Sequence, residues 1–97
     1  MSFAMRHGLR TMATVRVRGQ LKKLAGDTAE HELGGSTVEE VMRELERAHP
    51  AVAGWVLDER GRIRQHINVF VNGEQGEEQT AVAPGDRVEV IPAISGG

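Results

Sequence analysis

The segment "GGSTVEEVMRELERAHP", residues 34–50, constrains the architecture more than any other part of this chain. Its apolar residues recur at the i, i+3, i+4, i+7 spacing of a helix with one buried face. These residues are Val38, Val41, Met42, Leu45 and Ala48. Ser36 followed by Glu39 matches a capping box, and Pro50 marks the end of the pattern. The segment therefore predicts a helix over about residues 37–49.

Two candidate strands precede this helix. The segment "ATVRVRG" (13–19) alternates apolar and polar residues, as a half-buried strand does. The segment "TAEHEL" (28–33) is a weaker candidate for a second strand. Between them, "GQLKKLAGD" (19–27) carries two glycines and predicts a connection. Together the segments predict a hairpin with a long loop.

Two further strands follow the helix. The segments "HINVFVNGE" (66–74) and "AVAPGDRVEVIPA" (81–93) both alternate. Asn72-Gly73 is a strong tight-turn signal, and the 84–86 segment Pro-Gly-Asp predicts a second turn. Pro92 suits the end or edge of a strand. The inward positions of the predicted sheet are Val15, Val17, Ile67, Val69, Val88 and Val90.

Residues 50–65 follow no regular period. They contain Trp55, the only tryptophan, beside two aliphatic residues. We expect a short turn or helical piece that packs Trp55 against the edge of the core. The segment "DERGR" (58–62) predicts an exposed turn.

The order of elements predicts an α+β fold. A hairpin, one helix and at least two more strands on a single sheet leave few topologies. The most economical is the β-grasp arrangement, a mixed sheet of four to five strands around one main helix. We expect residues 12–92 to form this domain, with residues 1–11 as an N-terminal extension and residues 93–97 as a flexible C-terminal Gly-Gly tail.

Composition excludes several classes of function. The chain has 97 residues, 27% of them charged, and a formal net charge of −2 without a basic run, so nucleic acid is not an expected partner. It has no cysteine, which excludes disulfides, cysteine-ligated iron–sulfur clusters and a thiol nucleophile. No segment is apolar enough to span a membrane, and the N-terminus lacks the apolar core of a secretory signal. A cytoplasmic location is expected.

Three stretches resemble the β-grasp sulfur carriers, which share the fold of ubiquitin and end in Gly-Gly. They are "INVFVNGE" at 67–74, "APGDRVEVIPAISGG" at 83–97 and the capped helix at 36–49. The family comprises the thiamine-biosynthesis carrier, the small subunit of molybdopterin synthase and the carrier of thiocarboxylate-dependent cysteine synthesis. The resemblance covers roughly residues 12–97. The long 49–74 stretch looks like the cysteine-synthesis carriers and the longer molybdopterin-type relatives, and the former are favoured.

The resemblance implies a definite chemistry at Gly97. An ATP-dependent adenylyltransferase of the ubiquitin-activating type, with or without a rhodanese domain, would adenylate the Gly97 carboxylate. A sulfur donor would then displace AMP and leave a thiocarboxylate. A sulfur-accepting synthase would use that sulfur in the biosynthesis of cysteine, molybdopterin or a sulfur-containing metabolite. Gly96 and Gly97 carry no side chain that would obstruct a narrow nucleotide site. The chain would be a protein co-substrate that binds no cofactor of its own, and a metallopeptidase is a further candidate partner.

We expect partners to dock on the outward face of the sheet and along the tail. Phe70 and Ile91 are apolar residues at outward positions, and exposed apolar patches often mark interaction sites. Arg16 and Arg18 share that face and could pair with acidic groups of a partner. The tail contributes Ala93, Ile94 and Ser95 to the expected partner-binding residues.

Other functions stay open at this point. The same tail would serve a ubiquitin-like modifier that forms amide bonds to lysines through Gly97. The chain could also be a non-catalytic β-grasp interaction subunit that does not use its tail. His31, His49 and His66 lack the spacing of metal ligands, so no metal site is expected. No pairing of a nucleophile with a base is evident.

Overall fold

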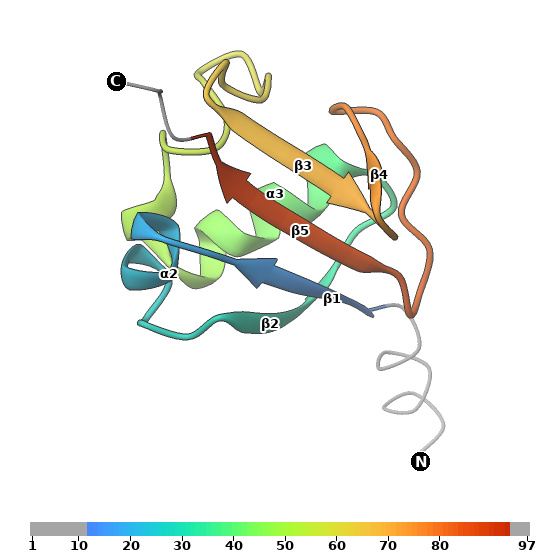
Figure 1. Ribbon diagram of the computed structural model, residues 1–97, viewed down its shortest axis with the longest axis horizontal. Helices are drawn as coiled ribbons and strands as arrows, with labels where there is room; N and C mark the ends of the chain where they lie inside the picture. The colour runs from blue at the N-terminus through green and yellow to red at the C-terminus, as the bar shows by residue number, and fades with distance from the viewer. Residues whose placement is uncertain (1–11, 94–97) are drawn as a thin grey trace.

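The computed structural model describes residues 12–93, which contain five strands, one main helix and two short helical segments (Figure 1). In chain order they are β1 (Met12–Val17), α2 (Gln20–Leu24), β2 (Glu30–Gly34), α3 (Val38–Ala48), the 3-10 helix η1 (Pro50–Val52), β3 (Ile67–Val71), β4 (Glu74–Gln75) and β5 (Arg87–Pro92). No helix within this part of the chain has both the length and the apolar composition to cross a membrane.

The strands form one mixed sheet in the order β2-β1-β5-β3-β4. The central strands β1 and β5 are parallel, and the other neighbours are antiparallel. Figure 1 shows the sheet in front and α3 crossing behind it. The predicted α+β class and β-grasp arrangement are confirmed, and β4 brings the number of strands to five.

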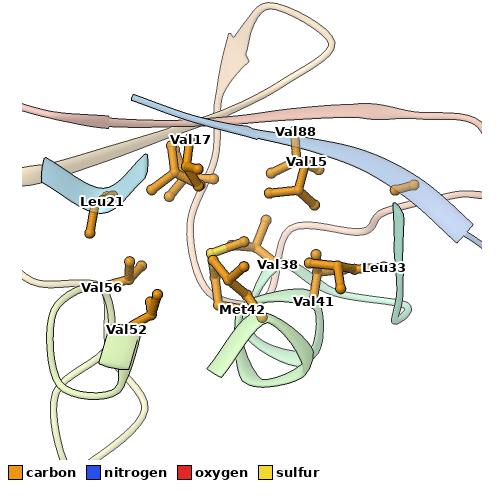
Figure 2. Close-up of a cluster of buried hydrophobic side chains, with 14 of the residues drawn as sticks. Val15, Val17, Leu21, Leu33, Val38, Val41, Met42, Val52, Val56 and Val88 are labelled. Atoms are coloured by element: carbon orange, nitrogen blue, oxygen red, sulfur yellow. The ribbon is translucent and has the colours of Figure 1, made fainter. Parts of the chain in front are cut away.

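The core lies between α3 and the inward face of the sheet (Figure 2). Alternation along the strands buries Val15, Val17, Val69, Val88 and Val90, and the helical period buries Val38, Val41, Met42 and Leu45. Ile67 is only partly buried and packs against this cluster. The prediction that Ala48 belongs to the buried face is wrong. It is the last residue of α3, and Val52 in the following turn fills the core there instead.

The N-terminal cap of α3 lies one residue later than predicted. Thr37 is the N-cap, and its Oγ1 accepts a hydrogen bond from the backbone N–H of Glu40 at 3.2 Å. The Glu40 carboxylate accepts the backbone N–H of Ser36 at 2.8 Å, so a serine does contribute to the cap. Ser36 cannot begin the helix because its carbonyl accepts the backbone N–H of Val82, which keeps this segment extended.

The connection between β1 and β2 also differs from the prediction. It contains the short helix α2, whose Leu21 is fully buried, and the following Ala25 is buried too. The antiparallel pairing of β1 with β2 confirms the predicted hairpin with a long loop. Leu21 of α2 lies near Val52 of η1 and Val56, as Figure 2 shows.

The expectation that Trp55 packs against the core edge is wrong. Trp55 is 44% exposed, the highest value among the large apolar residues between positions 12 and 93. The core receives Val52, Val56 and Leu57 from this segment instead. Residues 58–62 form the expected turn, in which the Asp58 carboxylate accepts two backbone N–H groups.

Candidate functional site

The candidate site begins where β5 ends. Strand β5 ends at Pro92, which is opposite Ile67 on β3. The exposed Ala93 adds one more backbone hydrogen bond, from its N–H to the carbonyl oxygen of His66 at 2.6 Å. This bond fixes the point at which the chain leaves the sheet. The remaining predicted tail residues, Ile94, Ser95, Gly96 and Gly97, lie outside the described residues, as does the predicted extension 1–11.

Phe70 and Ile91 lie on the outward face, as predicted, on the neighbouring strands β3 and β5. Phe70 is opposite Glu89, and Ile91 is opposite Asn68, so the two apolar residues are diagonal neighbours. Both side chains are half-buried. A diagonal pair of this kind brings side chains within reach of each other. The face therefore carries a small continuous apolar surface, which we call the sheet patch: Phe70 and Ile91.

Arg16 and Arg18 are exposed on the same face, and each forms an ion pair within the chain. Arg16 contacts Glu30 on β2 at 2.6 Å, and Arg18 contacts Glu89 on β5 at 3.2 Å. Pairs this exposed contribute little to stability because water screens them. An acidic partner would nevertheless have to compete with these glutamates. The sequence does not reveal the pairs, because they depend on strand order.

Glu89 lies between the arginines and the apolar residues of this face. It lies opposite Arg16 on β1 and opposite Phe70 on β3, because β5 is between those strands. The sheet thus brings Arg16, Arg18 and Phe70 around one carboxylate. Figure 1 shows β5 in the middle of this arrangement, with its end at the edge from which β3 starts.

A groove at the end of β5 was not predicted from the sequence. It has a volume of about 430 Å³. Its lining includes Leu21, Trp55, Arg64, His66, Ile67 and Pro92. Since Pro92 belongs to this lining, the groove is continuous with the base of the tail. The signal in the sequence was the single tryptophan next to Gly54, in a segment without a helical or strand period.

The shifted pKa values in this part of the chain have structural causes. Backbone N–H groups of Arg62 and Arg60 hold the pKa of Asp58 below its usual range. The Asn72 side chain and the backbone N–H of Ala83 do the same for Asp86 in the turn before β5. Burial raises the pKa of Glu46 on α3. These carboxyls lie in two turns and on a helix, and not around the end of β5.

Residues 12–93 contain three histidines, His31, His49 and His66. The rings of His31 and His49 meet edge to face at 5.0 Å, and His66 lies at the end of β5. Between residues 12 and 93, no group of three or more histidine, cysteine, aspartate or glutamate side chains is arranged to hold a metal ion. The His31–His49 contact joins β2 to the residue that caps the C-terminal end of α3.

Comparison with known proteins identifies the family. Small archaeal modifier protein 1 of Haloferax volcanii is 39% identical over 64 residues, which are 66% of this chain and 74% of that protein. Sulfur carrier protein CysO of Mycobacterium tuberculosis is 29% identical over 90 residues, 87% of this chain and 97% of that protein. A chain in the crystal structure of the Amycolatopsis orientalis BexX/CysO complex matches with a TM-score of 0.80 and 29% identity, over 88% of this chain and 99% of that chain. The profile of the ThiS family matches residues 15–97, and the chain belongs to the ThiS family.

Proposed function

We propose that this chain is a sulfur carrier that holds sulfur as a thiocarboxylate at Gly97. The observation that supports this most strongly is the match to the ThiS family over residues 15–97, which includes the Gly-Gly sequence. The mixed sheet, its single main helix and the likeness to a protein named as a sulfur carrier agree with it.

The chemistry proceeds in two steps on the carboxyl carbon of Gly97. A carboxylate oxygen attacks the α-phosphorus of ATP on the activating enzyme, and pyrophosphate leaves. A hydrosulfide or persulfide sulfur then attacks the carbonyl carbon of the mixed anhydride, and AMP leaves with the electron pair of the broken C–O bond. With hydrosulfide, loss of the proton on sulfur completes the thiocarboxylate. With a persulfide donor the adduct is an acyl disulfide, and a thiol of the partner enzyme cleaves its S–S bond, which releases the thiocarboxylate and leaves a disulfide between that thiol and the donor sulfur. ATP and the sulfur donor are substrates of the partner enzyme, and the chain is a co-substrate rather than a catalyst.

The position of β5 suits this chemistry. Residues 93–97, which we call the arm, would span about 17 Å when extended, enough to carry the last carbon into another protein's active site. The glycines permit backbone angles that other residues avoid and present no side chain to a narrow channel. The hydrogen bond between Ala93 and His66 gives this arm a fixed starting point on the sheet.

Partners dock on the sheet patch and along the arm in this proposal. They are an adenylyltransferase of the ubiquitin-activating type and a sulfur-accepting synthase, and a metallopeptidase is a further candidate. Phe70 and Ile91 supply apolar contact. Arg16 and Arg18 would break their ion pairs with Glu30 and Glu89 and form new ones with acidic groups of the partner. Cysteine synthesis as the pathway and the cytoplasm as the location stay predictions.

Intact mass measurement tests sulfur loading. Wild type incubated with ATP, sulfide and the cognate activating enzyme should gain the mass of one sulfur-for-oxygen exchange, about 16 Da. Deletion of Gly97 should abolish the gain, while circular dichroism should show an unchanged fold. If the function of the chain in the cell survives deletion of Gly97, the result would favour an interaction subunit that does not use its tail over a sulfur carrier.

A second function is supported by the likeness to small archaeal modifier protein 1. The same adenylate could be attacked by a lysine amine, which would form an amide bond and release AMP. Trypsin cleaves after Arg87, so a conjugate would carry residues 88–97 as a branch on the modified lysine. Branched peptides of this kind in cell extract, absent when Gly97 is deleted, would establish the modifier function alongside sulfur transfer.

A further inference from the structure

Trp55 is an exposed side chain on a firmly packed segment. It is 44% exposed, whereas Val52 and Val56 on either side of it are fully buried. Its backbone N–H donates to the carbonyl oxygen of Val52 at 2.9 Å. The backbone therefore holds the indole at the surface, although its apolar area would favour burial. An exposed tryptophan in a fixed position is typical of a binding surface.

The groove beside Trp55 has an apolar floor and fixed walls. Leu21, Ile67 and Pro92 form apolar parts of its lining. The backbone N–H of Arg64 donates to the carbonyl oxygen of Val56 at 2.8 Å, and the Arg64 Nε donates to the carbonyl oxygen of Gly54 at 2.5 Å. These bonds join the two segments that flank the groove. Backbone segments that are already joined in this way need less ordering when a ligand binds.

The rim of the groove carries a positive charge at Arg64. Arg64 and His66 line it, and no aspartate or glutamate does. Within residues 12–93, Arg64 forms no ion pair, whereas Arg16, Arg18, Arg43 and Arg47 all do. Asp58 is near Arg64, but its carboxylate accepts two backbone N–H groups of its own turn. The Glu46 carboxylate accepts the backbone N–H of Gly54 and is therefore also hydrogen-bonded within the chain. Arg64 thus leaves a positive charge at the groove for an acidic ligand.

We propose that this groove, defined by Trp55, Arg64, His66 and Pro92, docks a segment of the activating enzyme that presents an apolar side chain beside carboxylates. The inference rests on the proposed function. An enzyme that takes in the residues after Ala93 must also lie over Pro92, and hence over the groove. Tryptophan and arginine are the residue types that dominate binding energy at interfaces. The groove is separate from the sheet patch and adds a second contact on the other side of the arm's base.

Two variants and one control test the proposal by enzyme kinetics. The KM for the carrier in sulfur loading should rise about tenfold in Trp55→Ala and in Arg64→Glu, with kcat within about twofold of wild type. Arg47→Glu makes the same charge change on the exposed face of α3 and should leave KM unchanged. Circular dichroism verifies that each variant is folded. Arg64→Glu keeps the proposal testable if Trp55→Ala fails to fold.

The single tryptophan allows a direct binding measurement. Wild type labelled with 5-fluorotryptophan gives one fluorine resonance, from Trp55. Unlabelled activating enzyme should shift or broaden that resonance, and Arg64→Glu should require about tenfold more enzyme for the same effect.

The outcomes separate the two proposals. Normal sulfur loading by wild type, with unchanged KM in both variants, would overturn the groove proposal and leave the sulfur-carrier function intact. Absence of loading by wild type would contradict the function and, with it, the groove proposal that rests on it. A resonance shift caused by an RNA oligonucleotide or by anionic vesicles, and not by the enzyme, would also overturn the groove proposal.

Discussion

The backbone N–H of Ala93 donates a hydrogen bond to the carbonyl oxygen of His66 at 2.6 Å. This bond extends the pairing of β5 with β3 by one residue beyond the pair formed by Pro92 and Ile67. It anchors the base of the arm to His66, the residue directly before β3, the strand that carries Phe70. The sheet, the arm and the groove at Trp55 therefore meet at one end of β5.

Removal of this anchor should weaken sulfur loading without unfolding the chain. Ala93→Pro lacks the N–H donor and should cost about 1 kcal/mol in the free energy of unfolding. Because the base of the arm is no longer held, kcat/KM for loading should fall several-fold. Ala93→Ser keeps the donor and is the control. Loading by Ala93→Pro at the wild-type rate would show that the anchor has no part in presenting the arm.

The sheet patch should contribute to partner affinity. Phe70→Ala removes the larger apolar side chain of the patch. It should raise the KM of the activating enzyme for the carrier about tenfold. Asn68→Ala, two residues earlier on the same face of β3, is the matched control and should have little effect. Equal KM values for the two variants would exclude Phe70 from the interface, and urea unfolding would verify that both are folded.

The contact between α3 and the sheet should dominate stability. Leu45 is fully buried, and Leu45→Ala should cost about 2–5 kcal/mol because the helix cannot move in to close the cavity completely. Arg47→Ala on the exposed side of α3 should cost less than about 1 kcal/mol, since its pair with Glu44 is exposed. Urea denaturation measures both values. Similar costs for the two variants would contradict the assignment of the core.

Acid should destabilise the chain partly through two turn aspartates. The pKa values of Asp58 and Asp86 are lowered by folding, so their contribution to stability is complete above their unfolded pKa values and disappears as the pH falls through the folded ones. The free energy of unfolding should therefore decrease between roughly pH 5 and pH 2, and less steeply in the double variant Asp58→Asn/Asp86→Asn. Asp27→Asn, outside these turns, is the control. If the free energy of unfolding falls equally steeply with pH in wild type, the double variant and Asp27→Asn, the assignment of acid sensitivity to Asp58 and Asp86 would be refuted.

Local patterns in the sequence predicted the main elements of the fold. Alternation located β1, β3 and β5 because one face of each is buried, and the helical period located α3. The patterns failed where distant contacts determine local structure. Val82 keeps Ser36 extended and moves the cap to Thr37, and α2 forms where Leu21 can enter the core.

The candidate site was predicted only in part. The outward positions of Phe70 and Ile91 follow from alternation, but the pairing of Arg18 with Glu89 depends on β1 and β5 being neighbours. The groove at Trp55 combines segments that are far apart in the sequence. No local pattern reveals that Pro92, Trp55 and Leu21 line the same groove.

Tandem mass spectrometry of the C-terminal tryptic peptide shows which residue carries the sulfur. After loading with ATP, sulfide and the activating enzyme, trypsin releases residues 88–97, "VEVIPAISGG". Every fragment that contains Gly97 should carry the extra mass of one sulfur-for-oxygen exchange, and every fragment that lacks Gly97 should have its ordinary mass. Sulfur on a fragment without Gly97, or no sulfur in the peptide of a loaded wild-type chain, would contradict the thiocarboxylate at Gly97.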